Sequence, residues 1–401
     1  MAENYDVVIV GGGMVGLTLA CALGDTALKV AVLEAHPMES SWPEQSIGLR
    51  VSAITHASRK VFDSIDAWRG MVERRVTSYG EMHVWDASGD GVIHFDGAEA
   101  GAPSLGYIIE NRIIQLALME RMQQFANIDM LCPMRWQHWS DDGTQLTLTL
   151  EDGRQLNTQL LVGADGVHSQ VREQAGIETK GWGYDQDAVL AIVKTEKSHQ
   201  HTCWQRFLPS GPLAFLPMHN HYSCVVWSTT PEQARELLVD DEALFRTKLA
   251  DAFDHTLGEV VEVCERGTFP LRLQHTVDYV RQRIALVGDA AHSIHPLAGQ
   301  GVNLGILDAA ALAETLLGAY DARRDIGSLA TLRRYERWRK GQNLSMLLSL
   351  DGFKRLFGSD VMAVKIARNL GLNATNSLTP LKRLFMDYAM GERGDLPKTA
   401  L

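Results

Sequence analysis

The sequence of 401 residues lacks the marks of several protein classes. Its five cysteines are scattered and form no C-x-x-C pair, which favours reduced thiols in a cytosolic protein over a disulfide scaffold. No stretch approaches the roughly 18 uninterrupted apolar residues of a membrane-spanning helix, so we predict none. The segment 1–13 has neither a basic region nor a cleavage site, so we expect no signal peptide and a cytoplasmic location.

Basic residues are also in short supply. The chain carries 38 Lys and Arg against 49 Asp and Glu, and its net charge of −11 repels phosphate backbones, so we expect no nucleic acid among its partners. Repeats, long linkers and low-complexity segments are absent from the sequence, and 45% hydrophobic with 22% charged residues is ordinary for a globular protein. Only glycine is in mild excess, with 35 residues, and its meaning depends on where it clusters.

The hydrophobic pattern predicts an α/β domain interleaved with a sheet-rich one. Residues 5–10 and 29–34 are short buried strands with an apolar helix at 14–23 between them, so the chain opens with a βαβ unit. A helix at 111–125 and a strand–turn–strand pattern at 145–162 follow. Alternating strands prevail from 182 to 270, with a helical insert at 231–253. A buried strand at 283–287 and a helix at 301–317 precede a helical, basic tail after Ser328.

The first glycine cluster follows the first predicted strand and is typical of a dinucleotide-binding turn. It consists of Gly11, Gly12, Gly13, Met14, Val15 and Gly16, which read G-x-G-x-x-G. Gly11 permits the tight turn, Gly13 lets the backbone approach a pyrophosphate, and Gly16 lets the following helix pack on the strand. Glu34 lies 18 residues after Gly16, where a carboxylate binds an adenosine ribose. This motif alone leaves NAD and FAD open.

A second glycine cluster favours FAD. Residues 283–301 read RIALVGDAAHSIHPLAGQG, a buried strand ending in Gly288 and Asp289, then a Pro/Gly turn into a helix at Gly301. A nicotinamide enzyme needs no such second site, whereas FAD carries a ribityl chain and a flavin ring. Asp289 is suited to accept hydrogen bonds from the ribityl or neighbouring hydroxyls. The amides and dipole of the Gly301 helix suit the flavin edge that gains negative charge on reduction.

A third signature, GADGVHSQVR at 163–172, follows another apolar strand and taken alone could be a turn with a helix cap. Together and in order, the three motifs resemble those of the para-hydroxybenzoate hydroxylase family of FAD-dependent aromatic monooxygenases. Within that family RVSAI at 50–54, IEN at 109–111 and HSIHPLAGQGVNLG at 292–305 are similar to the ubiquinone-biosynthesis hydroxylases of bacteria. The likeness runs essentially from end to end.

The resemblance implies a hydroxylase that acts on a polyprenylated phenol with O2. NAD(P)H reduces FAD, oxygen forms a hydroperoxide on the reduced flavin, and its distal oxygen passes to the ring, so the protein must orient the ring and exclude water. Asp165 belongs to a signature linked to both FAD and NAD(P)H, and residues 296–301 should line the flavin ring. The implied cofactor-binding residues are Gly11, Gly13, Met14, Val15, Gly16, Glu34, Arg50, Arg112, Asp165, Gly288, Asp289, Pro296, Gly299, Gln300, Gly301, Val302 and Asn303.

His295 is the best candidate for a catalytic group near the ring by motif position. An equally good interpretation is that His292 and His295 only brace the turn. The pair reads H-x-x-H, but Pro-Leu-Ala-Gly follows and breaks any helix, and no carboxylate set is spaced to join it, so no metal site is predicted.

The patterns and the resemblance together predict an α/β fold: a Rossmann-like FAD-binding domain of the glutathione-reductase type, a mixed β-sheet substrate domain and C-terminal helices. We assign 1–72, 100–180 and 275–330 to the first, 73–99 and 181–274 to the second, and 331–401 to the third. Residues 352–391 hold six Lys or Arg against two Asp. They form either helices that cap the FAD domain with a solvated basic face, or an interfacial surface for anionic lipid or a protein partner, such as a ubiquinone-biosynthesis complex.

Three other functions stay open. A sister hydroxylase of the same pathway would act at another ring position, and a flavin reductase or dehydrogenase would use the same fold without inserting oxygen. A flavoprotein kept as a non-catalytic scaffold is the third, and the intact nucleotide-binding motifs argue against it.

Overall fold

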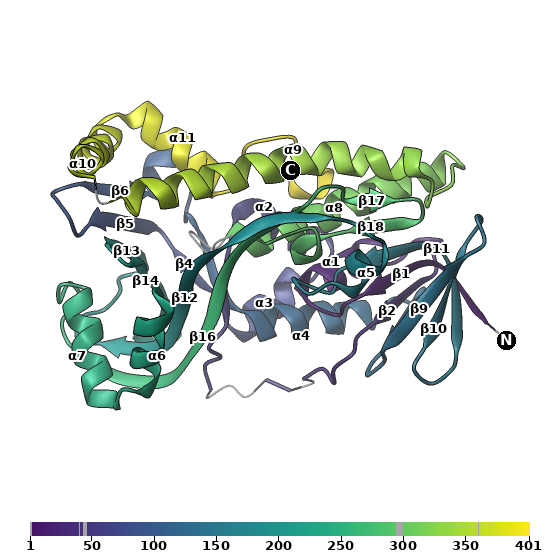
Figure 1. The fold of residues 1–401 in the computed structure, drawn as a ribbon, viewed down its shortest axis with the longest axis horizontal. Helices are drawn as coiled ribbons and strands as arrows, with labels where there is room; N and C mark the ends of the chain where they lie inside the picture. Colours follow the sequence, from purple (N-terminus) through teal and green to yellow (C-terminus); the bar gives the residue numbers. More distant parts are fainter. Residues whose placement is uncertain (1, 40, 43–45, 294–299, 360) are drawn as a thin grey trace.

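The computed structural model describes the chain except residues 1, 40, 43–45, 294–299 and 360, and its described strands form three sheets (Figure 1). The first sheet has the order β17-β18-β11-β1-β2-β8, and off this path β10 pairs with β11 and β9 pairs with β10. Its strands are β1 Glu3–Val10, β2 Val30–Leu33, β8 Ile128–Leu131, β9 Trp136–Asp141, β10 Leu146–Leu150, β11 Gln155–Gly163, β17 Val280–Arg281 and β18 Ile284–Leu286. The predicted βαβ unit and the strand–turn–strand pattern are confirmed, with ends shifted by a few residues.

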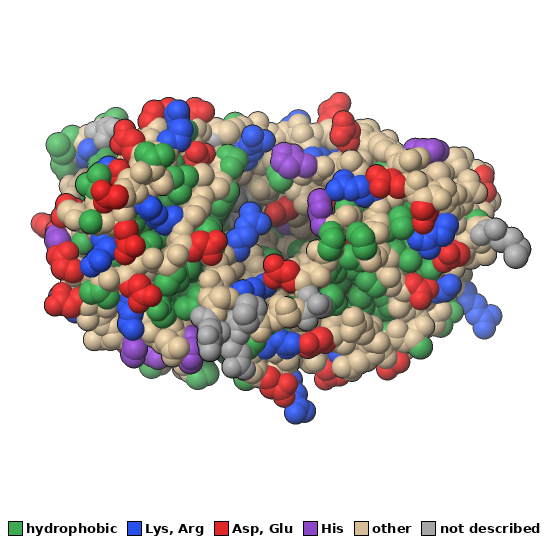
Figure 2. Space-filling view, turned by 90° about the horizontal axis from the view of Figure 1, so that it is seen from below, with side chains coloured by type: hydrophobic (Ala, Val, Ile, Leu, Met, Phe, Trp, Pro, Cys, Tyr) green, Lys and Arg blue, Asp and Glu red, His purple; other side chains and the backbone are tan. Residues whose placement is uncertain are grey.

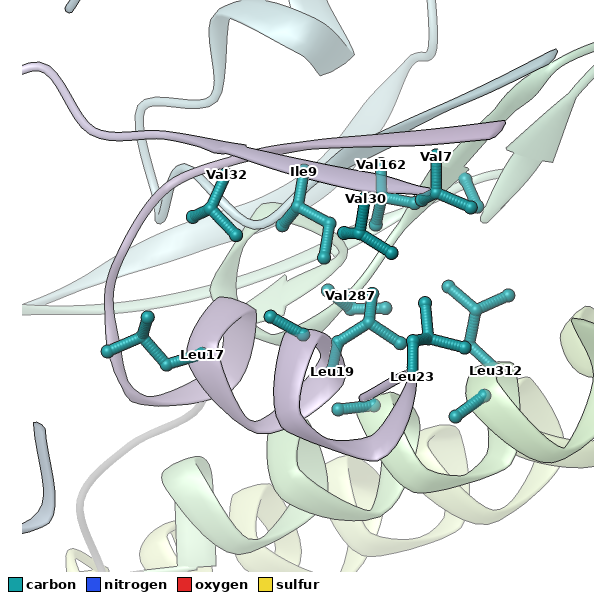
Figure 3. Close-up of a cluster of buried hydrophobic side chains, with 14 of the residues drawn as sticks. Val7, Ile9, Leu17, Leu19, Leu23, Val30, Val32, Val162, Val287 and Leu312 are labelled. Atoms are coloured by element: carbon teal, nitrogen blue, oxygen red, sulfur yellow. The ribbon is translucent and has the colours of Figure 1, made fainter. Parts of the chain in front are cut away.

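The core of this half lies between the sheet and two helices, α1 (Met14–Ala22) and α8 (Gln300–Asp321). Val7 and Ile9 of β1 pair in parallel with Val30 and Val32 of β2, and all four are fully buried because both faces of the sheet are covered. Figure 3 shows these side chains facing Leu17, Leu19 and Leu23 of α1 and Leu312 of α8. This packing fixes the turn between β1 and α1.

The second sheet has the order β19-β16-β12-β15-β14-β13-β5-β6. Its long antiparallel strands β12 and β16, of 17 residues each, run across the molecule between its two halves (Figure 1). Its strands are β5 Glu81–Asp86, β6 Val92–Asp96, β12 Thr179–Thr195, β13 Thr202–Leu208, β14 Gly211–Pro217, β15 Tyr222–Thr229, β16 Val260–Thr276 and β19 His292–Ser293.

Alternation along these strands separates two faces. Val189, Ala191 and Val193 of β12 pack with α6 (Pro231–Val239) and α7 (Glu242–Ala252), which close one side of the sheet. Ala188 and Ile192 lie on the other side, which is turned toward the first half of the molecule. The third sheet connects the halves with β3 Val51–Ile54, β7 Gly106–Glu110 and β4 Thr77–Tyr79.

The remaining described elements are mostly helical and include four short 3-10 turns. They are α2 His56–Ser64, α3 Trp68–Arg74, α4 Asn111–Met122, α5 Gln170–Gln174, α9 Leu329–Phe357, α10 Met362–Ser377, α11 Thr379–Ala389, η1 Gly97–Ala100, η2 His219–His221, η3 Gly288–Ala290 and η5 Lys398–Ala400. Helix α9 runs along the top of Figure 1 and packs against both halves, through Tyr335 at one end and Leu350 at the other.

One described helix, Gly301–Asp321, is long and apolar enough to cross a membrane by length and composition alone. Of its 18-residue window, 72% is buried inside the structure, where the helix packs between α1 and α9. Its burial is that of a core helix.

The C-terminal helices differ from the expectation of a basic, solvated face. Arg368 of α10 and Lys382 of α11 are buried, where they pair with Asp86 and Glu99 of the β5–β6 region. Helix α10 lies along the edge strand β6 of the second sheet (Figure 1). The difference arises because the buried carboxylate of Asp86 requires a cation, which Arg368 of the tail supplies, while Lys382 pairs with the exposed Glu99 of η1.

Candidate active site

Three turns separated by more than a hundred residues meet at one edge of the first sheet. Strands β18, β11 and β1 are parallel neighbours. The glycine turn follows β1, the signature with Asp165 follows β11, and Gly288 follows β18. Ligands of open α/β sheets bind outside the carboxyl ends of such strands, so this edge is the candidate site.

The glycine turn has the geometry that a phosphate-binding turn needs. Gly11 has φ +111°, and a Cβ there would lie 2.3 Å from the Ala164 carbonyl oxygen, so no other residue fits. A Cβ on Gly16 would lie 2.0 Å from the Gly11 oxygen, which shows how closely α1 packs on the turn. A Cβ on Gly13 would meet nothing within 4 Å, which leaves open space over the first amides of α1. Open amides at a helix N-terminus suit a phosphate.

Glu34 stands beside this turn at the end of β2. Its Oε2 accepts a hydrogen bond from the Gly12 amide at 2.8 Å, and its Oε1 accepts one from the His36 amide at 2.9 Å. Gln115 of α4 donates from Nε2 to the Gly12 oxygen at 2.9 Å. The carboxylate is therefore held in place and keeps further lone pairs, as binding a ribose hydroxyl requires.

The Asp165 signature braces the second turn and joins it to the third. Asp165 Oδ2 accepts from the Val171 amide at 3.1 Å, whereas its buried Oδ1 has no hydrogen-bond partner among the described residues. Burial raises the pKa of this carboxyl. Arg172 donates to the Ala290 oxygen at 3.0 Å and to the Val167 oxygen at 2.8 Å, so it links the second motif to the third.

Asp289 has the position of a ligand-binding group. Its side chain is exposed to solvent, yet surrounding protein desolvates the carboxyl and raises its pKa, while the charges of His292 and Arg50 act in the opposite direction. An accessible but desolvated group is expected where a ligand replaces solvent. The preceding Gly288 has φ +59°, and a Cβ there would be 3.1 Å from Val15 Cγ2, so the first and third motifs are in contact.

A fully buried network of charged and polar side chains, centred on Asp308, holds the turn at Gly288 in place. Asp308 of α8 accepts from Arg339 Nε of α9 at 2.8 Å and from Asn343 Nδ2 at 2.9 Å. Its other oxygen pairs with His292 Nε2 at 2.5 Å and accepts from the Gly288 amide at 3.3 Å. Burial alone would raise the pKa of Asp308, but the charges and hydrogen bonds of His292 and Arg339 hold it at about 2. His292 thus braces the turn, the role that the second interpretation gave to His292 and His295 together.

Two other expected residues, Arg112 and Asn303, have hydrogen-bond partners within the protein. The buried Glu110 accepts from Arg112 Nε at 2.9 Å and from the Gly48 amide at 2.6 Å. Asn303, in the first turn of α8, donates to the Ala53 oxygen at 2.7 Å and accepts from the Thr55 amide at 3.0 Å. These bonds position the Arg50 segment beside the site. His295, Pro296 and Gly299 lie outside the described residues, and the Gln300 side chain is not described; Gly301 and Val302 are in the first turn of α8.

An apolar cluster lies beside the Arg50 segment. On the face of the second sheet away from α6 and α7, Ile192, Leu216 and Cys224 cluster with Leu49 and Val51 from the Arg50 segment. Burial raises the pKa of the Cys224 thiol to about 12, so it stays protonated and is no nucleophile. Ile192 and Cys224 are fully buried and Leu216 is half-buried, so this cluster is protein core that supports the Arg50 segment.

The fold and the converging turns define a flavin-dependent oxidoreductase of the dinucleotide-binding type. The chain belongs to the FAD binding domain family, which matches residues 4–343, and in it to the ubiquinone-biosynthesis monooxygenases. It is 40% identical to the ubiquinone hydroxylase UbiL of Rhodospirillum rubrum, over 96% of this chain and 89% of that protein. It is 36% identical to the ubiquinone biosynthesis monooxygenase COQ6 of Danio rerio (96% and 90%) and to the 3-demethoxyubiquinol 3-hydroxylase of Escherichia coli (97% and 99%).

Solved structures share the fold of this chain. The p-nitrophenol 4-monooxygenase PnpA of Pseudomonas putida has a TM-score of 0.79 at 19% identity and covers 97% of this chain and 98% of its own. PqsL of P. aeruginosa has a TM-score of 0.76 at 23% identity, over 93% and 100%. The predicted fold and the predicted cofactor, FAD, are confirmed.

Sequence reasoning missed the residues that hold the turns together. Arg172 was visible as the last residue of its signature, but nothing indicated that it reaches Ala290. Asp308, Arg339 and Asn343 carry no local motif. Only the placement of these three polar residues on the inner faces of α8 and α9 could have drawn attention to them.

Proposed function

We propose that this chain hydroxylates the aromatic ring of a polyprenylated phenol in ubiquinone biosynthesis, with NAD(P)H as the electron donor. The observation that carries the proposal is the meeting of the three turns at the carboxyl ends of β1, β11 and β18, with the exposed Asp289 carboxyl beside them. The names of the relatives, which are ubiquinone-pathway hydroxylases, support the same substrate class.

The residues present fit FAD. In this proposal the amides opened by Gly13 take the pyrophosphate, Glu34 the adenosine ribose and Asp289 the ribityl chain. Gly301 and Val302 face the flavin with the N-terminal amides of α8, and Arg50 and Arg112 flank the cofactor. His295, Pro296 and Gly299 are proposed from motif position alone.

Bound FAD supplies the redox chemistry, taking electrons from a nicotinamide and activating oxygen. The chain's own contribution is placement. The network around Asp308 fixes Gly288 and therefore the direction of the Asp289 side chain. The apolar cluster of Ile192, Leu216 and Cys224 would keep the Arg50 segment in place on the side of the second sheet.

The finer assignment rests on motif likeness. The motifs resemble those of the octaprenylphenol hydroxylases, so we propose that type of substrate. A sister hydroxylase acting at another ring carbon is the second candidate, supported by the E. coli relative named for 3-hydroxylation of demethoxyubiquinol. We further propose a cytoplasmic enzyme that meets its lipid substrate through peripheral membrane contact of the C-terminal region or within a biosynthetic protein complex.

Deleting the gene in its host and measuring the quinone precursors by mass spectrometry tests the pathway. We expect a polyprenylated phenol that lacks one hydroxyl to accumulate, and the missing position identifies the ring carbon. An unchanged quinone profile would refute the pathway. Substrate reduction without oxygen consumption by the purified protein would instead support the reductase alternative.

A further inference from the structure

Helix α10 packs with an asparagine-rich face toward the edge of the second sheet. Asn369, Asn373 and Asn376 recur at helical spacing and accept hydrogen bonds from two amides of the edge strand β6 and from the Gly91 amide just before it. The Gly91 amide donates to Asn369 Oδ1 at 2.6 Å, the Val92 amide to Asn373 at 3.0 Å, and the His94 amide to Asn376 at 3.1 Å. The asparagines therefore satisfy an open sheet edge.

A buried charge pair fixes the same orientation. Arg368 donates from Nε to Asp86 Oδ2 at 2.5 Å and from Nη1 to the Phe357 oxygen at 2.7 Å, at the end of α9. Asp86 is itself buried, so rotating α10 would leave its negative charge in the protein interior without a cation beside it. The outward face of the helix is thus set by contacts on the inner side.

The outward face of α10 carries no charge. Met362, Ile366 and Leu370 are 69%, 54% and 64% exposed and follow one another at intervals of four residues. The exposed residues among 361–378, all of them described, are Val361, Met362, Ala363, Ile366, Ala367, Leu370, Gly371, Asn373, Ala374, Ser377 and Leu378. Elsewhere the surface is mixed: acidic, basic and hydrophobic side chains are interspersed over the face in Figure 2. A contiguous uncharged helix face marks an interaction site.

We propose that this face inserts into the headgroup region of a bilayer that contains anionic lipids. Of the six Lys or Arg in 352–391, Arg368 and Lys382 are buried in ion pairs. The other four, Lys354, Arg355, Lys365 and Arg383, are partly or fully exposed, and their charge complements an anionic surface. Exposed Arg355 and Arg383 lie on the neighbouring helices, and the exposed aromatic side chains of Phe353 and Tyr388 are suited to the interface. The inference rests on the proposed function, because a polyprenylated substrate resides in the bilayer.

Flotation with vesicles tests the proposal. The purified FAD-loaded full chain is mixed with vesicles of phosphatidylcholine alone or of equal parts phosphatidylcholine and phosphatidylglycerol. We expect it to float with the anionic vesicles. Leu370→Glu should lower the partition coefficient about tenfold or more, because a charge replaces a buried apolar side chain in the interface. The matched control is Val239→Glu, which changes an 83% exposed apolar residue of α6 and should float like the unchanged chain.

Three outcomes would overturn the proposal. In the first, the unchanged chain does not float with either kind of vesicle. In the second, Leu370→Glu floats as well as Val239→Glu. In the third, the unchanged chain is a dimer without lipid and Leu370→Glu is a monomer, which would mean that the face joins two copies of the chain. FAD content and circular dichroism check the fold of each variant. Hydroxylation of detergent-solubilised substrate is measured separately, so a failure of the proposed function is distinguished from a failure of membrane binding.

Discussion

The buried network behind the third motif gives the sharpest prediction. In Asp308→Asn the side chain keeps its shape but loses the charge that Arg339 and His292 face at 2.8 and 2.5 Å. All three side chains are buried, so the guanidinium of Arg339 would be left without its counter-charge. Removing one partner of a buried ion pair costs about 3–5 kcal/mol.

The pKa of Asp308 gives a second measure of the same energy. Its fall from the ordinary 3.8 to about 2 corresponds to about 2 kcal/mol of folding stability. Because the folded-state pKa is the lower one, this contribution is fully present above about pH 4 and is lost as the pH falls toward about 2. We therefore expect Asp308→Asn to lower the free energy of unfolding by about 2–5 kcal/mol at neutral pH.

Urea unfolding of the FAD-free and FAD-loaded protein measures this cost. The matched control is Asp63→Asn, which breaks the half-exposed Arg59–Asp63 pair of α2 and should cost under about 1 kcal/mol. The difference between Asp308→Asn and the unchanged chain should shrink below about pH 4. Equal destabilisation by the two substitutions, or a difference independent of pH, would show that the network does not stabilise the fold as argued.

The remaining predictions concern the cofactor. Gly13→Val should keep the fold, since a Cβ there meets nothing within 4 Å, yet weaken FAD binding at least about tenfold in a dialysis assay. Gly16→Ala should instead lower the thermal midpoint of the FAD-free protein, because its Cβ would lie 2.0 Å from the Gly11 oxygen; an unchanged midpoint would contradict this reading. Asp289→Ala should weaken FAD binding about tenfold with folding retained, and retention of FAD equal to the unchanged chain would remove the ribityl assignment.

The elements of the site were predictable from local patterns, whereas their meeting was implied only by the family resemblance. Each glycine turn follows an apolar strand, so the pattern of apolar residues before Gly11, Asp165 and Gly288 indicated three strand ends. The order β18-β11-β1 depends on pairings between strands more than a hundred residues apart, which local patterns do not encode. The contact of Val15 with Gly288 and the reach of Arg172 to Ala290 follow from that order alone. The domain boundaries stay a prediction.

The C-terminal helices show why periodicity does not decide which face of a helix turns inward. Helix α10 has an apolar stripe and an asparagine stripe. Burying Met362, Ile366 and Leu370 would contribute about 1.5–3 kcal/mol each. Turning them inward would break three hydrogen bonds from Gly91 and β6, at about 1 kcal/mol each, and the buried Arg368–Asp86 pair, at about 3–5 kcal/mol. The two sums are similar, so the inward asparagines cost the fold little. The apolar stripe stays available for burial elsewhere, and a lipid surface adds its stabilisation without competing for the sheet edge.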